Sequence, residues 1–385
     1  MRKIFRLNSY FEEELKFYPE PVVLNKNTIQ RNSLLEKLFF LVADKNDFVL
    51  TTNCLNPKMF EYWNEKGIEF AEEFCRKFSD EKLEFIEWGK TSDFVNSEIL
   101  YNPIKIGDSK QINSKIFQGN IKIRLEISPL EIFIVKDFQS IQKILADRSA
   151  TYILKPEFNF SGKDTKILRN KNDVKSLEKI FSNSDEKKYV LEELAENRIR
   201  DFSGIFSCSH GMVKNLAITE MIISKTRAYI GSIIELEKEY SFFNALCETV
   251  QDFVNTLPVK YEGSLSADGF EFIRDGERDF QLVSEINFRY SMGRVLYDLI
   301  QKYPSGYKVF GLHFFRIVDK SISEKVLLSL FSKLEKDFQS FILAVTPFQN
   351  IDGNIANLLG LHIASNSRKD LDLILESLKK YFKEC

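Results

Sequence analysis

Three oxygen-bearing side chains on two strand-like segments constrain this chain most. Glu285 and Asn287 stand two residues apart in the alternating segment LVSEINFRY, so on a strand both point to one face. Asp268, in the preceding segment GSLSADGFEF, can approach them from a neighbouring strand. Mg²⁺ prefers such oxygen ligands and often shares them with substrate phosphates. The pattern predicts paired strands with a metal site, although polar side chains on an edge strand are the plainer interpretation.

The composition indicates a globular protein with a large core. Of its 385 residues, 44% are hydrophobic and 29% are charged, which favours two or three lobes. The 54 basic and 56 acidic residues give a formal net charge of −2 and form no long blocks of one sign. Nucleic acid is therefore not an expected partner.

The N-terminal segment and the cysteines indicate a reducing compartment. Charge returns at Glu12 before an apolar region develops, so we expect no signal peptide and a cytoplasmic protein. The most apolar run, LLEKLFFLVAD, is too short and too interrupted to span a bilayer, and we expect no membrane contact. The five cysteines are scattered without a CxxC pair, which favours reduced thiols.

Helix-like and strand-like segments alternate along the chain. The first part is of βα type, with a helix and then a strand in 31–50, a helix over 57–79 and a short strand at 85–89. Two later strands meet at a hairpin turn at His210–Gly211. Further helices are expected at 138–146, 239–257, 323–338 and 370–382, and further strands near 152–168, 341–347 and 360–365.

Four motifs in a fixed order carry a resemblance to a known family. They are NSK at 113–115, ILKPEFNFSGK at 153–163, YVLEELAENRIRDFS at 189–203, and Asp268 followed by EINFR at 285–289. None is specific alone, but their order and separations resemble the ATP-grasp superfamily of ATP-dependent carboxylate–amine ligases. The resemblance implies a mixed α+β and α/β protein with the ATP-grasp fold, in which two α+β subdomains grip ATP.

The resemblance also implies a division of the chain into four parts. Subdomain A of the ATP-grasp fold would follow an N-terminal α/β lobe of the pre-ATP-grasp type. Subdomain B would carry the metal site, and a C-terminal α/β segment would pack on the core. In chain order, the expected parts are 1–112, 113–190, 191–299 and 300–385.

Two lysines match the positions that contact ATP phosphates in this superfamily. Lys155 ends an apolar strand just before Pro156, where its ammonium can reach phosphate oxygens and support catalysis. Lys115, in NSK, would be the earlier of the two. Taken alone, each would be read as an ordinary surface lysine.

A polar loop at 158–164 resembles the loop that covers the triphosphate. Backbone N–H groups of a Ser-Gly turn can donate to phosphate oxygens without a side chain intervening. The resemblance assigns this role to Ser161, Gly162 and Lys163. Asp164 departs from the glycine-richer form of the family, and a plain hairpin loop is the alternative.

The segment YVLEELAENRIRD matches the part of the family that binds the nucleoside. Glu192 is expected near the adenine amino group, with the backbone of Glu193, Leu194 and Ala195 near the ring. Asp201 matches an acidic position that holds the ribose hydroxyls, where the family more often has Glu. Solvated residues at a strand end are the plainer interpretation of the glutamate pair.

Arg289 and the metal group define the expected chemistry. Arg289 follows on the same face as Glu285 and Asn287, and its fork could hold a substrate carboxylate or the acyl phosphate. The cofactors implied are ATP and Mg²⁺, with two ions expected and Mn²⁺ as a substitute. The partners implied are a small-molecule carboxylate and an amine, and a homodimer is compatible with the sequence.

Three classes of function follow from the resemblance. The first is a ligase that forms an acyl phosphate for attack by an amine, with an amino acid or peptide as one kind of substrate. The second is a phosphotransferase on the same fold, and the third is a nucleotide-binding protein without activity. The three histidines, His210, His313 and His362, show no catalytic spacing and are expected to be structural.

Overall fold

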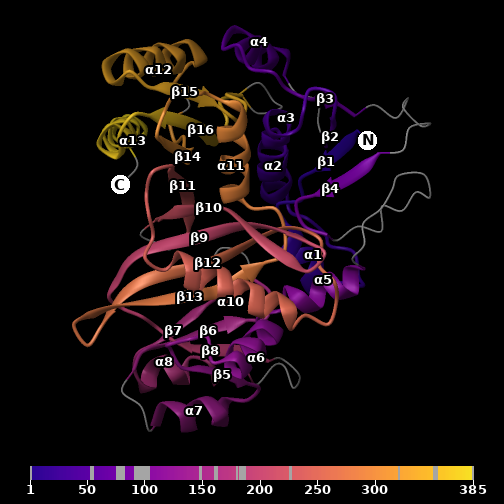
Figure 1. Ribbon diagram of the computed structural model, residues 1–385, viewed down its shortest axis with the longest axis vertical. Helices are drawn as coiled ribbons and strands as arrows, with labels where there is room; N and C mark the ends of the chain where they lie inside the picture. Colours follow the sequence, from indigo (N-terminus) through magenta and orange to yellow (C-terminus); the bar gives the residue numbers. More distant parts are fainter. Residues whose placement is uncertain are drawn as a thin grey trace.

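The computed structural model describes residues 2–52, 56–74, 83–90, 105–146, 150–159, 164–178, 181, 188–224, 228–319, 321–349 and 354–383. Its strands form three sheets, one of eight strands and two of four. In Figure 1 the large sheet runs through the middle of the molecule, with the N-terminal sheet beside its upper part and the other small sheet below it. Among the described residues, no helix has both the length and the apolar character needed to cross a bilayer.

The N-terminal lobe is a parallel sheet flanked by helices, as the βα pattern predicted. The predicted helix over 57–79 is wrong in length, because the chain turns at Gly67 with a φ of 70°. There the N–H groups of Gly67 and Ile68 donate to Asn64 and Trp63, which ends the helix. The strands, in the order β3-β2-β1-β4, and the helices are β1 Lys3–Arg6, α1 Phe11–Phe17, α2 Lys26–Leu35, α3 Leu38–Val42, β2 Phe48–Leu50, α4 Pro57–Glu65, β3 Glu72–Glu73 and β4 Glu84–Glu87.

The second small sheet is antiparallel and lies at the opposite end of the molecule, with helices packed against it (Figure 1). Its strand order is β5-β8-β6-β7. We call this part, residues 115–193, the small-sheet lobe. It follows α5 Ile106–Ile112 and comprises α6 Lys115–Leu125, β5 Ile132–Val135, α7 Phe138–Ala146, β6 Tyr152–Pro156, β7 Lys166–Leu168, α8 Lys171–Lys175 and β8 Tyr189–Glu193.

The large sheet is antiparallel, with the order β13-β12-β9-β10-β11-β14-β16-β15. The predicted hairpin at His210–Gly211 is confirmed, and both residues have the positive φ angles that a tight turn requires. Its elements are β9 Arg198–Ser209, β10 Met212–Ile223, β11 Tyr229–Glu235, α10 Phe243–Asn255, β12 Gly263–Arg274, β13 Glu277–Asn287, α11 Met292–Lys302, β14 Val309–Arg316, α12 Glu324–Phe338, β15 Phe341–Ala344, β16 Leu358–Ser365 and α13 Arg368–Phe382.

The division of the chain into four parts stays a prediction, but two features of the sheets bear on it. The expected boundary between 190 and 191 falls inside β8. The segment 300–385 adds β14, β15 and β16 to the large sheet, so it continues that sheet and does not merely pack on it. It also shares a core with the N-terminal lobe, where the indole N–H of Trp63 donates to the carbonyl of Ala344 at 2.9 Å.

Two fully buried histidines in the large sheet predict a loss of stability in mild acid. Burial lowers the pKa of His313 to about 3 and that of His362 to about 4. In the unfolded chain both bind protons below about pH 6.5, so the stability present above that pH is lost as pH falls. Between pH 7 and 5 we expect a loss of about 2 kcal/mol per histidine in the free energy of unfolding.

Urea unfolding of the His313→Phe variant at both pH values checks this prediction. Neither ring nitrogen of His313 has a hydrogen-bond partner among the described residues, so the substitution removes no bond to them. Its unfolding free energy should change less between the two pH values than that of the wild type. His210→Asn, at the exposed turn, should keep the wild-type pH dependence. An unchanged pH dependence in His313→Phe would contradict the prediction.

Candidate functional site

The structure brings the three predicted metal ligands together on the β12–β13 pair. Asp268 lies opposite Glu285 in the register, and Ser266 lies opposite Asn287. The Asp268 carboxylate accepts hydrogen bonds from the Ser203 hydroxyl at 2.7 Å and from the Asn287 amide at 2.9 Å. Burial, together with the nearby charge of Glu285, raises the pKa of Asp268 to about 6. The two strands thus hold two carboxylates and one amide within reach of a common ion.

This donor set suits a hard cation that shares its shell with phosphates. Among the described residues, no cluster of three His, Cys, Asp or Glu side chains could hold a metal by itself. The set therefore depends on the amide of Asn287 and on ligands from outside the chain. Mg²⁺ is commonly bound in this way, by one or two carboxylates with phosphate and water completing the octahedron.

Lys115 faces the metal group from the first turn of α6. Ser114 is the N-cap of this helix, and its hydroxyl accepts from the N–H of Phe117 at 3.2 Å. The Lys115 ammonium forms an ion pair with Glu285. Burial alone would raise the pKa of Glu285, but the charge and hydrogen bond of Lys115 outweigh it and lower that pKa. The first predicted phosphate lysine therefore lies directly beside the predicted metal ligands.

The second predicted phosphate lysine, Lys155, lies on β6 and is paired with Glu192 of β8. The same carboxylate is also bound by Lys122 of α6, at 2.6 Å. Burial would raise the pKa of Glu192, yet the two ammonium groups together lower it well below its usual range. Burial lowers the pKa of Lys155 despite this partner. Glu192 is thus a buried carboxylate held by two cations.

Lys122 is a site residue that the motifs did not predict. It stands seven residues after Lys115 on α6, which places both ammonium groups on one helix face, two turns apart. Its ammonium also donates to the carbonyl of Ser284 on β13 at 2.6 Å. This spacing, read on the helix that begins at NSK, was the signal available in the sequence.

Side chains of the α5–α6 region fix this lysine face against β13, the edge strand of the large sheet. Gln118 donates to the carbonyl of Ile286 at 2.6 Å and accepts from its N–H at 2.9 Å. Asn113 accepts from the N–H of Phe288 at 3.1 Å. These bonds satisfy backbone groups along the free edge of β13 and just after it. They fix the positions of Lys115 and Lys122 relative to the two strands that carry the predicted metal ligands.

Side chains of the protein fill the space that the motifs predict for the nucleoside. A slot of about 10 Å³ separates Ile153 and Glu192 of the small sheet from Phe270 of the large one. The Arg198 guanidinium lies 3.6 Å from the centre of the Phe270 ring and pairs with the predicted ribose ligand Asp201 at 2.9 Å. The slot is too small for a purine while Arg198 occupies it.

The predicted adenine contacts are partly in use within the protein. Both carboxylate oxygens of Glu192 bind lysines, and its expected contact with the adenine amino group stays a prediction. The N–H groups of Glu193 and Leu194 donate to the carbonyls of Glu131 and Thr151 at 2.9 and 2.8 Å. Ala195 is buried at the end of this segment, beside Phe270.

The predicted triphosphate loop lies mostly outside the described residues. Ser161, Gly162 and Lys163 lie outside the described residues, and their roles stay predictions. Asp164 is described and has a φ of 63°, the left-handed conformation that glycine adopts most readily. The glycine-richer form of the family would fit this backbone with less strain.

Arg289 follows the predicted metal ligands on the chain, but both terminal nitrogens of its guanidinium already have partners. One terminal nitrogen pairs with Glu12 of α1 at 2.9 Å, and the other donates to the carbonyl of Tyr290 at 3.1 Å. Its guanidinium lies 5.7 Å from the ring centre of Trp88. Its Nε is buried and has no hydrogen-bond partner in the part of the chain that the structure describes. A bidentate grip on a carboxylate would therefore require Glu12 to release the arginine.

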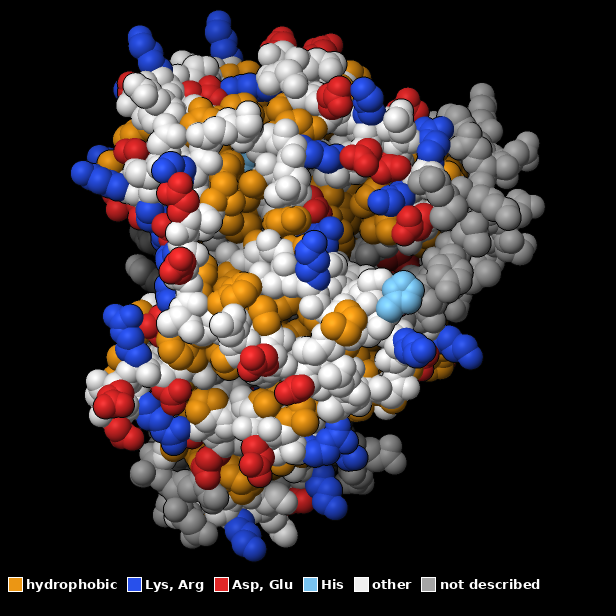
Figure 2. Space-filling model, in the orientation of Figure 1, with side chains coloured by type: hydrophobic (Ala, Val, Ile, Leu, Met, Phe, Trp, Pro, Cys, Tyr) orange, Lys and Arg blue, Asp and Glu red, His pale blue; other side chains and the backbone are white. Residues whose placement is uncertain are grey.

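Next to Arg289 the molecule contains a cavity of about 480 Å³. It is bounded by β1 and β4 of the N-terminal lobe, by β9 and β12 of the large sheet, and by α11. We call it the interlobe cavity. Figure 2 shows basic and acidic side chains mixed over one face of the molecule, without a large patch of one sign.

Comparisons with known proteins identify the fold. No protein-family description and no curated protein matches the sequence. Solved structures match over nearly the whole length. N5-carboxyaminoimidazole synthetase from Staphylococcus aureus, complexed with ADP, has a TM-score of 0.55 at 11% identity, covering 98% of this chain and 97% of that one.

Two further structures agree with this match. The N5-carboxyaminoimidazole synthase from Aspergillus clavatus, complexed with ADP and 5-aminoimidazole ribonucleotide, has a TM-score of 0.56 at 11% identity, covering 99% of both chains. Phosphoribosylamine–glycine ligase from Thermotoga maritima has a TM-score of 0.57 at 12% identity, covering 98% of this chain and 96% of that one. The chain has the ATP-grasp fold, as its four motifs predicted.

Proposed function

We propose that this protein is an ATP-dependent ligase that activates a substrate carboxylate as an acyl phosphate and joins it to an amine. One observation carries the proposal. Three lysines form ion pairs with glutamates between the two sheets: Lys115 and Lys122 of α6 and Lys155 of β6. One of these glutamates, Glu285, is itself a predicted metal ligand on β13, opposite Asp268 of β12. Cations next to a hard-metal donor set form a suitable cradle for a triphosphate.

The nucleotide would replace the internal ion pairs of this cradle. Lys115 and Lys155 would bind phosphate oxygens, while Asp268, Glu285 and Asn287 would hold Mg²⁺. When bound, the metal neutralises negative charge on the β- and γ-phosphate oxygens. Two of the similar structures were solved with ADP, which agrees with a nucleotide in this fold.

The reaction proceeds in two displacements. An oxygen of the substrate carboxylate attacks the γ-phosphorus, the bond to the β,γ-bridging oxygen breaks, and ADP leaves. The amine nitrogen then attacks the acyl carbon of the acyl phosphate, the carbon–oxygen bond to phosphate breaks, and phosphate leaves. The nitrogen loses its extra proton to phosphate or water. The lysines position and neutralise the phosphoryl group, and no side chain has to act as a general base.

The interlobe cavity is the proposed site of the carboxylate acceptor. Arg289 lines it and stands two residues after Asn287, so an acceptor bound there lies at the end of the metal strands. The substrate carboxylate would replace Glu12 as the ion-pair partner of Arg289. In this arrangement the attacking carboxylate oxygen reaches the γ-phosphorus from the side of the N-terminal lobe. The nucleotide lies on the side of the small-sheet lobe.

Arg198→Ala should increase nucleotide affinity, because it removes the side chain that fills the slot over Phe270 and frees Asp201. We expect ATP to bind about fivefold to tenfold more tightly, since displacing one stacked, ion-paired guanidinium costs on the order of 1 kcal/mol. Calorimetric titration with Mg²⁺-ATP measures the change. Arg169→Ala, which changes an exposed arginine of the small-sheet lobe, is the control. Weaker binding by Arg198→Ala would show that this arginine holds the nucleotide.

A screen for ADP release tests the proposed function. The protein is incubated with Mg²⁺-ATP and pools of carboxylates and amines, and products are identified by mass spectrometry. We expect ADP and phosphate to form together with an amide only when both substrates are present. A phosphorylated acceptor without an amide would replace the ligase with the phosphotransferase. The absence of ADP with every pool would overturn the proposal.

A further inference from the structure

Several buried polar atoms that line the interlobe cavity have no hydrogen-bond partner among the described residues. Three such atoms belong to its lining: Nζ of Lys90, Oγ of Ser264 and Nε of Arg289. They come from three separate places, namely the chain after β4, the start of β12 and the chain after β13. A buried polar group without a hydrogen bond costs about 1–3 kcal/mol. Three around one cavity indicate that a ligand supplies the missing acceptors.

The acidic side chains that line the cavity are already engaged. Glu87 pairs with Arg6 at 2.9 Å, and Asp298 pairs with Arg294 at 2.9 Å. The remaining three have these partners: Asp44 pairs with Lys302 at 3.3 Å, Asp47 accepts from the N–H of Lys3 at 2.8 Å, and Glu262 accepts from the N–H of His210 at 2.6 Å. The lining atoms that lack a partner among the described residues can all donate, and two of them belong to cationic side chains, so an anionic group of a ligand would satisfy them.

Aromatic rings form much of the rest of the wall. Trp88 and Tyr290 lie with their ring centres 6.0 Å apart, and Tyr261 meets Phe288 edge-on at 5.0 Å. These rings pack against one another and give the cavity aromatic wall surface beside its polar and charged groups. Such a wall suits a flat or apolar body and not a strongly hydrated one.

We infer that the acceptor carries two anionic groups on an aromatic or apolar body, with the carboxylate that is activated at Arg289 and a second anion at Lys90. The inference rests on the proposed function for the identity of the first group only. Lys90 is then the residue that selects dianions over monoanions. Burial lowers the pKa of Lys90 to about 8, although the negative charges of Glu87 and Asp108 act in the opposite direction.

Binding of benzoate and of isophthalate, measured by calorimetry without ATP, tests this inference. The two probes share one aromatic ring and differ in the number of carboxylates. We expect isophthalate to bind at least about tenfold more tightly than benzoate, because it adds a hydrogen bond between two charged groups. Equal affinity of the wild type for the two probes would overturn the inference.

Variants of Lys90 assign the difference to this residue. In Lys90→Met the preference for isophthalate should vanish while benzoate binding stays unchanged, and Lys90→Arg should restore part of the preference. Lys45→Met, an exposed lysine of the same lobe, should behave as the wild type. A preference that persists in Lys90→Met would overturn the role of Lys90. Because no ATP is present, failure of the ligase proposal leaves this result unaffected, and the reverse also holds.

Discussion

Glu285→Gln should nearly abolish ATP turnover while leaving the protein folded. The amide keeps the size of the side chain but loses the charge that would hold Mg²⁺ opposite Asp268. Turnover should fall by about a hundredfold or more, since a group that stabilises the transferring phosphoryl charge is lost. The measurement is the rate of ADP release with the acceptor and amine that the screen identifies. Circular dichroism and urea unfolding report whether the fold is kept.

Glu277→Gln is the matched control for this variant. Glu277 lies on the same strand, β13, but is exposed at the hairpin end, opposite Arg274 in the register. Its turnover should equal that of the wild type. A Glu285→Gln protein that releases ADP at the wild-type rate would remove Glu285 from the metal site, and with it the assignment of the β12–β13 pair.

Lys122→Met should lower the free energy of unfolding by about 3 kcal/mol. The substitution leaves the buried Glu192 carboxylate with Lys155 as its one cationic partner among the described residues, and it also breaks the bond from α6 to Ser284. Removing one partner of a buried ion pair is costly because the remaining charge stays buried. Urea unfolding followed by circular dichroism measures the change.

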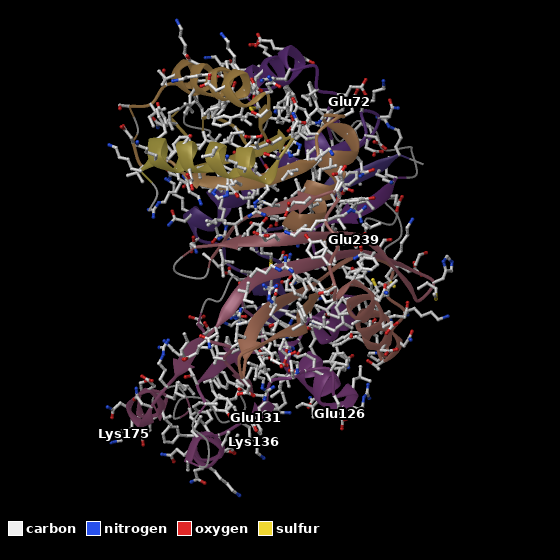
Figure 3. The ribbon with its side chains drawn as sticks, turned by 60° about the vertical axis from the view of Figure 1, so that its left-hand side comes forward. Glu72, Glu126, Glu131, Lys136, Lys175 and Glu239 are labelled. Atoms are coloured by element: carbon white, nitrogen blue, oxygen red, sulfur yellow. The ribbon has the colours of Figure 1, made fainter. Side chains whose placement is uncertain are left out.

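The control and a second variant separate charge from packing. Lys136→Met changes an exposed lysine of the small-sheet lobe, labelled in Figure 3, and should cost about 0.5 kcal/mol or less. Adding Glu192→Gln to Lys122→Met should recover part of the lost stability, because the unbalanced charge is gone. If Lys122→Met is as stable as Lys136→Met, the carboxylate is not held as the structure indicates.

Local sequence patterns predicted the metal strands well. A period of two in LVSEINFRY placed Glu285 and Asn287 on one face, and strand pairing then brought Asp268 opposite Glu285. These relations depend on neighbours along one strand or across one hairpin. The position of Lys115 at the start of a helix was readable for the same reason, because the Ser114 cap lies beside it in the sequence.

Contacts between the two sheets could not be read from the sequence. Lys122 looks like one of many solvated helix lysines until Glu192 of another sheet is placed beside it. Arg198 lies in a polar run, and its stacking on Phe270 depends on the approach of two sheets that are distant in sequence. The cavity lined by Lys90 likewise forms only where the N-terminal lobe meets the large sheet.

Calorimetric titration of ATP into the wild-type protein tests the central claim most directly. The claim is that a nucleotide binds between the two sheets, with its phosphates against the lysines and with Mg²⁺ on β12 and β13. We predict one ATP bound per chain in the presence of Mg²⁺ and much weaker binding when EDTA removes the metal. Absence of ATP binding in the presence of Mg²⁺ would contradict the account.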